Sequence, residues 1–379
     1  MSETLVSVVM PCLNEEDAIG FCIQKIRAAF DDMGIDGEII VCDNGSTDRS
    51  TEIAEMMSAK VIHQPLRGYG NAYIKGFSSA KGKYFVMGDS DDTYDFRLIP
   101  KFLEPLIKGD FDFVTGSRFL SEQGLENNPV LHRIVGNPLI TFILNRLFGT
   151  KYTDVYCGFR AFTREAYELI EPVSPGMEFN LELAINAGLA KLRIQEVPIC
   201  LAPRKGKSKL RTIRDGWRSL RMMLLYAPNK VFMYPGIFFL IIGAVTHIGL
   251  SLGLLKHEGR QFGFVTGILA MVFTVVGFKI LSLGLHTKTY SWSRRFDREN
   301  LLLRRFYRFF TLEIGLMSGF VMITGGVLLF VYLILDRLRL NLLPSPHPEQ
   351  FALAATLVIL GFEIFFSSLF ISSMSMRKR

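Results

Sequence analysis

The sequence predicts an α/β domain followed by a helical membrane domain, and three observations lead to this fold class. The first half alternates short β-branched or apolar runs with helical patterns, which is typical of α/β proteins. Four later segments are apolar over about the 20 residues that span a bilayer. Finally, 49% of the 379 residues are hydrophobic and the mean hydropathy is +0.27, which is too apolar for an ordinary soluble enzyme.

The first four strands are expected at residues 5–10, 38–42, 60–63 and 84–87. A helical pattern follows each of the first three, and the first helix runs through Phe30 with isoleucines on one face. Strands and helices that alternate at this spacing indicate a parallel sheet covered by helices.

Two further strands are expected at residues 113–115 and 192–200, with a helix before the last one at residues 177–191. Residues 131–147 are apolar almost all round, apart from Arg133 and Arg146. That pattern indicates a helix that contacts either the core or a membrane.

The second half of the chain is expected to lie on and in a membrane. Residues 212–226 carry Trp217 on an apolar stripe and arginines off it, which is typical of an interfacial helix. Membrane spans are expected at about residues 231–255, 262–286, 311–335 and 352–374. The predicted organisation is a domain at 1–210, an amphipathic juxtamembrane helix at 211–230 and a four-helix membrane domain at 231–379 with a basic loop at 287–310.

Charge predicts the orientation in the membrane. The net charge of +7 does not indicate nucleic acid, because the basic residues gather around the apolar segments, where membrane lipids are the expected partner. The middle loop holds seven Lys and Arg residues, whereas each outer loop holds two. Because positive loops stay on the cytoplasmic side, the α/β domain and both termini are expected in the cytoplasm.

An acid-rich loop follows the strand at residues 84–87. Asp89, Asp91, Asp92 and Asp95 fall within seven residues at the carboxyl end of that strand, where open α/β sheets bind ligands. Carboxylates this close repel one another unless a cation offsets their charge, so we expect a hard divalent metal ion to bind here. The alternative is an acidic turn that caps the next helix.

Several motifs at strand ends carry a resemblance to a known family. Segments 10–16 (MPCLNEE), 43–48 (DNGSTD) and 89–91 (DSD) resemble the successive signatures of glycosyltransferase family 2, whose nucleotide-sugar-binding domain has the GT-A fold. Segments 116–119, 154–160 and 204–209 are similar to those of polyprenyl-phosphate glycosyltransferases such as dolichyl-phosphate mannose and glucose synthases. The resemblance covers roughly residues 5–225, and the four spans fit membrane-anchored members only as a class.

The resemblance implies transfer of a hexose, with inversion, from a UDP- or GDP-sugar to undecaprenyl or dolichyl phosphate, with Mg²⁺ or Mn²⁺ as cofactor. A divalent cation meets the charge that develops on a leaving diphosphate. Asp89 and Asp91 are the expected metal pair, and Asp89 is also placed near the nucleotide. Asp92 departs from many family sequences, and a metal ligand, a helix cap and a sugar contact all stay open for it.

Nucleotide recognition is implied for three residues. Asp43 ends the second strand, where a carboxylate accepts hydrogen bonds from base or ribose; its alternative is an Asx-turn acid. Pro11 and Glu15 match the motif that lines the nucleotide pocket, and their alternatives are a loop-shaping proline and a solvated acid. Asn44 replaces a second acid common in the family, so that acid's role does not carry over.

The acceptor requires cations rather than a base. A lipid phosphate monoester carries most of its second charge near neutral pH, so it is a nucleophile once it is oriented and neutralised. The residues implied for this task are Arg118, Arg133, Arg204 and Lys209. The loop 204–209 is one residue shorter than the family pattern, and attraction to anionic headgroups is the alternative for its lysines.

Other residues of the resemblance complete the expected site. Asp154 and Arg160 match a segment that shapes the site, and Glu178 lies where related enzymes keep an acid. For Glu182, one helical turn along, the alternative is a solvated side chain.

Two charged residues are expected inside the membrane, Lys279 and Glu363. A lone charge there is costly, so we expect them to pair. The alternative is that Lys279 extends to the headgroups.

Other functions remain open from sequence. A processive polysaccharide synthase is disfavoured because no Q-x-x-R-W motif follows the acid-rich helix. A catalytically silent sugar-nucleotide sensor or a lipid-transport subunit is a different class built on the same fold. The oligomeric state, including a homo-oligomer, is also open.

Overall fold

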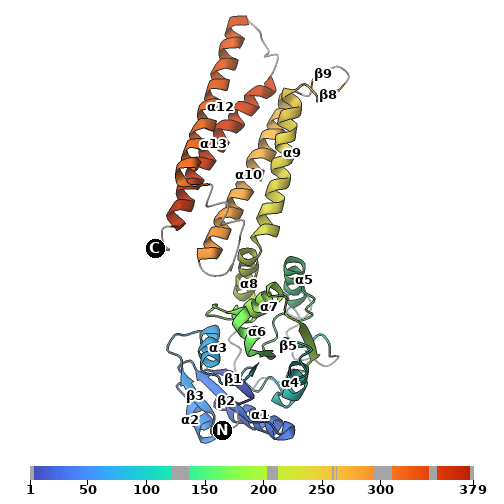
Figure 1. Cartoon of the computed structure of the whole chain (residues 1–379), viewed down its shortest axis with the longest axis vertical. Coiled ribbons are helices and arrows are strands. Elements are labelled where there is room, and N and C mark those ends of the chain that lie inside the picture. The colour runs from blue at the N-terminus through green and yellow to red at the C-terminus, as the bar shows by residue number, and fades with distance from the viewer. Residues whose placement is uncertain are drawn as a thin grey trace. The chain divides into compact units, whose positions relative to one another are not determined.

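A seven-stranded sheet organises the first half of the chain, with the strand order β3-β2-β1-β4-β6-β5-β7. Figure 1 labels β1, β2, β3 and β5 of this sheet. The structure is a computed structural model that describes residues 4–121, 136–202, 212–257, 260–261, 263–293, 310–340 and 348–375. The chain forms two compact units, Met1–Met223 and Leu224–Arg379. The strands are β1 (Val6–Cys12), β2 (Gly37–Asp43), β3 (Lys60–His63), β4 (Tyr84–Met87), β5 (Phe113–Ser117), β6 (Arg160–Thr163) and β7 (Ile194–Pro198).

Helices connect these strands as the sequence alternation predicts, and one more helix follows the last strand. They are α1 (Ile19–Met33), α2 (Ser50–Met56), α3 (Tyr69–Ser78), the 3₁₀ turn η1 (Phe96–Leu98), α4 (Ile99–Ile107), α5 (Asn137–Phe148), α6 (Arg164–Ile170), α7 (Phe179–Leu189) and α8 (Thr212–Tyr226). In α5, Leu144 is buried while Leu139 and Phe142 are exposed, so this helix contacts the core along one face only.

The sheet is mixed rather than parallel, which corrects the sequence prediction at one strand. β1, β2, β3 and β4 pair in parallel, and so do β5 and β7. β6 lies between β4 and β5 and runs antiparallel to both. β6 has the sequence RAFT, which begins with a buried arginine and so lacks the continuous apolar run that revealed β4, and the sequence pattern did not reveal it.

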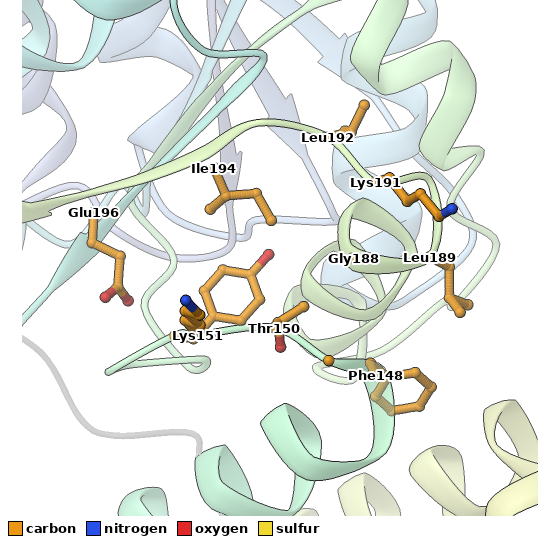
Figure 2. Close-up of a pocket in the computed structure, with 11 residues that line it drawn as sticks. Phe148, Thr150, Lys151, Gly188, Leu189, Lys191, Leu192, Ile194 and Glu196 are labelled. Atoms are coloured by element: carbon orange, nitrogen blue, oxygen red, sulfur yellow. The ribbon is translucent and has the colours of Figure 1, made fainter.

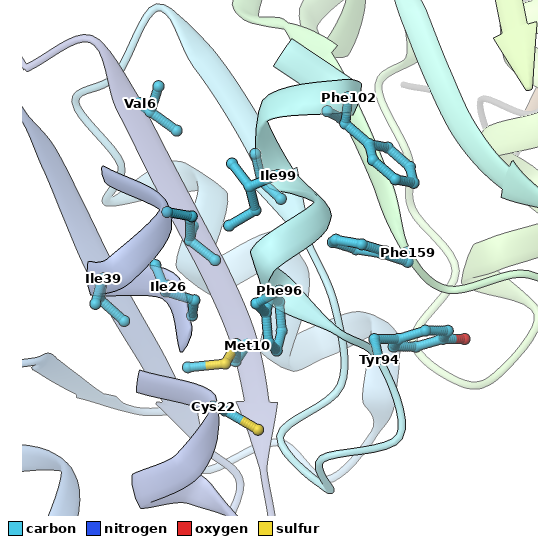
Figure 3. Packing of buried hydrophobic residues seen from close by; sticks show 14 of the residues in the cluster. Val6, Met10, Cys22, Ile26, Ile39, Tyr94, Phe96, Ile99, Phe102 and Phe159 are labelled. Carbon is cyan, nitrogen blue, oxygen red and sulfur yellow. The ribbon is translucent and has the colours of Figure 1, made fainter. Parts of the chain in front are cut away.

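Hydrophobic side chains pack on both faces of the sheet. Because successive side chains of a strand point to opposite faces, Val8 and Met10 of β1 enter one cluster and Val9 enters the other. Figure 3 shows Met10 beside Ile26 of α1 and Phe96 of η1 in the first cluster. These two cores hold the strands in place, so the carboxyl ends of the parallel strands, all except β6, form one fixed edge.

The second unit contains four helices long and apolar enough to cross a membrane, counted among the described residues. They follow a short π-helical turn η3 (Asn229–Met233) and are α9 (Tyr234–Ser251), α10 (Phe264–Ser293), α12 (Leu312–Leu340) and α13 (Pro348–Ser375), with a two-residue hairpin, β8 (Lys256–His257) and β9 (Arg260–Gln261), after α9. The four predicted spans are therefore confirmed, and the protein is an integral membrane protein. A Cβ added at Gly277 or Gly319 would collide with the backbone of a neighbouring helix, so these glycines permit close packing in lipid.

The predicted intramembrane ion pair is confirmed. The ammonium Nζ of Lys279 on α10 lies 2.9 and 3.0 Å from the two carboxylate oxygens of Glu363 on α13. The side chains are 54% and 27% exposed within the chain. Lys279 thus bonds to a neighbouring helix instead of extending alone to the headgroups.

Helix α8 exposes a tryptophan among basic residues. Trp217, Arg218 and Arg221 are exposed, whereas Met222 and Met223 are buried. An exposed ring beside arginines is consistent with contact to a lipid surface, and the interfacial position of this helix stays a prediction.

Candidate active site

The sheet register brings the predicted site motifs to one edge. Met87 of β4, Arg160 of β6 and Thr115 of β5 lie side by side in one row across the three strands. The acid-rich loop therefore leaves the sheet next to the 154–159 segment, and the Arg118 segment leaves on its other side. On the far side of β4, the hydroxyl of Ser90 donates a 2.7 Å hydrogen bond to the carbonyl of Pro11.

The two predicted metal ligands hold defined positions in the loop after β4. Asp89 is half-buried and its Oδ1 accepts a 2.8 Å hydrogen bond from the hydroxyl of Tyr69 on α3. Asp91 is 5% exposed, and its Oδ1 accepts a hydrogen bond from the backbone N–H of Thr93 at 3.1 Å. Burial raises the pKa of the Tyr69 hydroxyl and the nearby Asp89 charge raises it further, so this phenol remains a donor at neutral pH.

Asp92 has a different environment from its neighbours. Its Oδ1 lies 2.7 Å from the ammonium of Lys25 on α1, and its backbone has a left-handed φ of 61°. The helix-cap alternative for Asp92 is wrong, because Asp95 caps η1 through the backbone N–H of Arg97. The ion pair gives Asp92 a structural role, since it ties the acidic loop to α1.

The donor set of the loop fits a catalytic divalent metal. No group of three or more His, Cys, Asp or Glu side chains with metal-binding spacing occurs within the described parts of the chain. Mg²⁺ usually binds through one or two carboxylates together with substrate phosphates and water, and not through a complete protein cage. Two aspartates on one short loop, Asp89 and Asp91, match that requirement.

Asp43 is held tightly at the end of β2. Its carboxylate accepts hydrogen bonds from the backbone N–H groups of Ser46 at 2.9 Å and Gly45 at 3.2 Å, and its Oδ2 lies 3.1 Å from Nδ1 of His63. Burial acts to raise the pKa of Asp43, but hydrogen bonds from Ser46, His63 and Gly45 outweigh it and lower the pKa. Asp43 therefore forms the Asx turn that the alternative prediction described. This turn does not exclude a contact with a nucleotide.

Glu15 and its neighbours line a small cavity next to this turn. The cavity of about 280 Å³ is also lined by Asn14, Thr47 and Asp48. The side-chain oxygen of Asn14 accepts a hydrogen bond from the backbone N–H of Thr47 at 2.7 Å, and the backbone N–H of Glu15 donates to the hydroxyl of Ser50 at 2.8 Å. These bonds join the loops after β1 and β2 into one rim.

Arg118 forms a two-point ion pair with Asp154. Its Nε lies 2.6 Å from Oδ2 and its Nη2 lies 2.8 Å from Oδ1. The Asp154 side chain is fully buried, whereas that of Arg118 is 17% exposed. Asp154 also accepts a 2.6 Å hydrogen bond from the side-chain amide of Asn137. Asp154 thus orients the arginine.

Arg160 and Glu182 are buried and contact the backbone. The guanidinium of Arg160 donates to the carbonyl oxygens of Asn180 and Val155, at 2.5 and 2.8 Å. Glu182 is 0% exposed and its Oε2 accepts hydrogen bonds from the backbone N–H groups of Val173 at 3.1 Å and Ser174 at 2.8 Å. The solvated alternative for Glu182 is wrong, because this carboxylate organises the loop before α7.

Glu178 is the N-terminal cap residue of α7, yet its side chain makes no capping hydrogen bond. No hydrogen-bond partner is found for its buried Oε2 in the described part of the chain. Arg133, Arg204 and Lys209 lie outside the described residues.

Sequence reasoning overlooked three side chains of this edge: Tyr69, Asn180 and His63. Asn180 lies on α7, and its side-chain amide donates a 3.2 Å hydrogen bond to the Tyr69 hydroxyl. His63 is the last residue of β3 and pairs in register with Asp43, and Tyr69 begins the helix that follows this strand. Their position at the end of a predicted strand or after it was a signal that sequence reasoning could have used. Asn180 had none.

A larger cavity lies elsewhere in the first unit. It has a volume of about 660 Å³ and is lined by the ends of α5 and α7 and by β7, including Lys151, Lys191 and Glu196 (Figure 2). None of the predicted site residues that the structure describes lines it. The strand edge, and not this cavity, is therefore the candidate active site.

Carboxylates and an oriented arginine along the carboxyl edge of a helix-covered sheet define an α/β enzyme with a ligand site at that edge. The membrane-length helices, four of them in the described part of the chain, make it a membrane enzyme. The chain belongs to glycosyltransferase family 2, and its first unit has the GT-A fold. The family model for glycosyl transferase family 2 matches residues 7–170, and the model for the family 2 C-terminal transmembrane region matches residues 285–375.

Curated relatives agree with this assignment to the glycosyltransferases. The low-salt glycan biosynthesis hexosyltransferase Agl6 of Haloferax volcanii is 37% identical over 97% of this chain and 89% of its own length. A dolichyl-phosphate hexose transferase of the same organism is 36% identical over 56% of this chain and 89% of its own. The dolichol-phosphate mannosyltransferase of Pyrococcus furiosus is 29% identical over 86% of this chain and 91% of its own length.

Among solved structures, glucosyl-3-phosphoglycerate synthase from Mycobacterium tuberculosis is similar with a TM-score of 0.47 and 25% identity. The similarity covers 59% of this chain and 78% of that one.

Proposed function

We propose that this protein transfers a hexose from a UDP- or GDP-sugar to the phosphate of a polyprenyl phosphate, with inversion at the sugar carbon. Membership of glycosyltransferase family 2 and relatives named as dolichyl-phosphate hexose and mannose transferases support this substrate class. The observation that carries the proposal is the single sheet edge that gathers Asp43, the Asp89–Asp91 pair and Arg118.

The donor binds across the ends of β2, β1 and β4. Asp43, Pro11 and Glu15 face the nucleoside, and Asp43 stays ionised because its hydrogen bonds lower its pKa. Asp89 and Asp91 hold Mg²⁺ or Mn²⁺, which when bound supplies positive charge for the leaving diphosphate.

The acceptor phosphate binds on the other side of the acidic loop, at Arg118. A phosphate oxygen attacks the anomeric carbon, a new carbon–oxygen bond forms, and the bond to the nucleoside diphosphate breaks with both electrons on the departing oxygen. No side chain removes a proton, because the phosphate is already ionised near neutral pH. Arg118 orients the phosphate, and Arg133, Arg204 and Lys209 are proposed to add positive charge.

The membrane unit retains the enzyme where its lipid acceptor lies. The basic loop at 287–310 supports an orientation with the GT-A domain and both termini in the cytoplasm. The amphipathic helix α8 adds contacts to anionic headgroups. In this orientation the enzyme acts at the cytoplasmic membrane face.

The proposal is tested by sugar transfer to polyprenyl phosphate in detergent or liposomes. Labelled UDP- and GDP-sugars are offered with undecaprenyl or dolichyl phosphate, and label is counted in the organic phase. The wild type should transfer label from one donor, and Asp91→Asn should abolish transfer while the protein remains folded.

The matched control is Asp95→Asn, because Asp95 lies in the same loop but pairs with Arg97 and caps η1. That variant should keep most activity. Label in a polymer, or nucleotide release that does not respond to polyprenyl phosphate, would overturn the proposal in favour of a polysaccharide synthase or a non-catalytic subunit. Full activity of Asp91→Asn would refute the metal assignment.

A further inference from the structure

The hydroxyl of Tyr69 lies between Asp89 and Asn180. It donates to Oδ1 of Asp89 at 2.8 Å and accepts from the side-chain amide of Asn180 at 3.2 Å. A phenol has one proton, and the amide N–H occupies its oxygen as a donor, so the proton is directed at the carboxylate. Asp89 is thereby held by a side chain from another element.

Tight packing surrounds this hydroxyl. A Cβ at Gly158 would lie 3.2 Å from the Tyr69 hydroxyl, 3.1 Å from that of Tyr94 and 3.5 Å from the amide nitrogen of Asn180. The backbone N–H of Gly158 also donates to the Tyr94 hydroxyl at 2.9 Å. The absence of a side chain at residue 158 therefore lets three polar side chains gather behind the acidic loop.

The start of α3, which carries Tyr69, is anchored from the loop before α7. A Cβ at Gly68 or Gly70 would collide with the backbone carbonyls of Pro175 and Ser174. The backbone N–H of Asn71 donates to the carbonyl of Pro175 at 3.1 Å. Because Glu182 binds the backbone of that same loop, its carboxylate stabilises the position of α3 indirectly.

Asn180 is anchored as well. The residue is 5% exposed, and its backbone carbonyl accepts a hydrogen bond from Arg160, the first residue of β6. Arg160 lies beside Met87, the last residue of β4, so the anchor of Asn180 is in the strand next to the acidic loop. The two ends of this hydrogen-bonded chain are thus tied to neighbouring strands of one sheet.

We propose that Tyr69 and Asn180 are positioning residues that aim the carboxylate of Asp89 at the metal. This inference rests on the proposed function, because it takes Asp89 as a metal ligand. Partners hydrogen-bonded to a metal-binding carboxylate orient it, and their loss typically costs roughly 10- to 100-fold in metal affinity. Asn180 acts through Tyr69, so its removal should cost less than that of Tyr69.

The test measures Mn²⁺ binding to the full-length protein in detergent, with UDP or GDP present, by electron paramagnetic resonance of free and bound Mn²⁺. Tyr69→Phe should bind Mn²⁺ roughly 10-fold more weakly or worse, and Asn180→Ala should show a smaller loss. Activity of both variants should recover at raised Mn²⁺, whereas a merely structural defect would not respond to the metal.

The matched control is Tyr84→Phe, at the start of β4 and so at the strand end away from Asp89. Tyr84 is buried, and its ring centre lies 5.5 Å from the ammonium of Lys83. This variant should bind Mn²⁺ like the wild type. Equal affinity of Tyr69→Phe and wild type would overturn the inference, whereas a wild type that binds no Mn²⁺ at all would refute the metal in the proposed function.

Discussion

Arg118 donates two hydrogen bonds to the carboxylate of Asp154, from Nε to Oδ2 at 2.6 Å and from Nη2 to Oδ1 at 2.8 Å. Such two-point pairs fix the plane of the guanidinium as well as its position. Asp154 is fully buried and is itself held by Asn137. The direction of Arg118 is thus set from inside the protein.

Replacement of Arg118 by lysine should impair transfer although the charge is kept. A lysine ammonium cannot reproduce the fork, and a hydrogen bond to a charged group contributes about 1.5–3 kcal/mol, or roughly 10- to 100-fold in kcat/KM. Steady-state kinetics with varied polyprenyl phosphate should show a raised KM for this acceptor, whereas KM for the sugar nucleotide should change little.

Arg193→Lys is the matched control. Arg193 makes a similar two-point pair with Asp112, at 3.0 and 2.6 Å, but its side chain is 56% exposed and lies outside the predicted site. This variant should transfer sugar normally. A normal acceptor KM for Arg118→Lys would contradict the assignment of Arg118 to the acceptor phosphate.

Asp154 should make stability depend on pH in the acid range. Burial acts to raise its pKa, but the hydrogen bonds and charge of Arg118 and the amide of Asn137 outweigh burial and lower the pKa. A carboxyl whose pKa is lower in the folded state contributes stability above its unfolded pKa of about 3.9, and that contribution is lost as the pH falls through the folded value.

Asp154→Asn should therefore unfold at a lower temperature than the wild type at neutral pH. This difference in unfolding temperature should become smaller as the pH drops below about 4. Thermal unfolding in detergent, followed by intrinsic fluorescence from pH 7 to pH 3, measures both curves. A gap of constant size across that range would show that Asp154 does not titrate with folding as argued.

The ion pair of Lys279 and Glu363 should behave as one unit. Removing one partner leaves a lone charge near the middle of a span, which costs about 2.5–3.5 kcal/mol on insertion scales. Lys279→Ala and Glu363→Ala should each lower the melting temperature in liposomes, and the double variant should be no worse than either single one. Losses that add up in the double variant would exclude the pairing as the source of stability.

Glu182→Gln should destabilise the first unit. The buried carboxylate accepts backbone hydrogen bonds from Val173 and Ser174, and weakening such charge-assisted bonds costs about 1–3 kcal/mol in the free energy of unfolding. Glu168→Gln on α6 is the control, because Glu168 is exposed and surface changes usually stay within about 0.5 kcal/mol. Denaturant unfolding compares the two, and equal stabilities would contradict the role of Glu182.

The sequence by itself determined the features that depend on local patterns. Short apolar runs revealed the strand that ends at Asp43 and the strand that ends at Met87, just before Asp89, because a buried strand is a short apolar run followed by polar residues. Four apolar segments revealed the spans, because a bilayer demands length and apolarity together. The cost of a lone charge in lipid predicted that Lys279 and Glu363 pair.

Only the tertiary structure decided which distant residues meet. It inserted β6 antiparallel between β4 and β5, and it buried Glu182 against a loop backbone. It also brought Asn180 to Tyr69 across 111 residues of sequence, and Lys25 to Asp92 across 67. These contacts follow from strand order and helix packing, which no local pattern encodes, so the support behind the acidic loop became visible only in the folded chain.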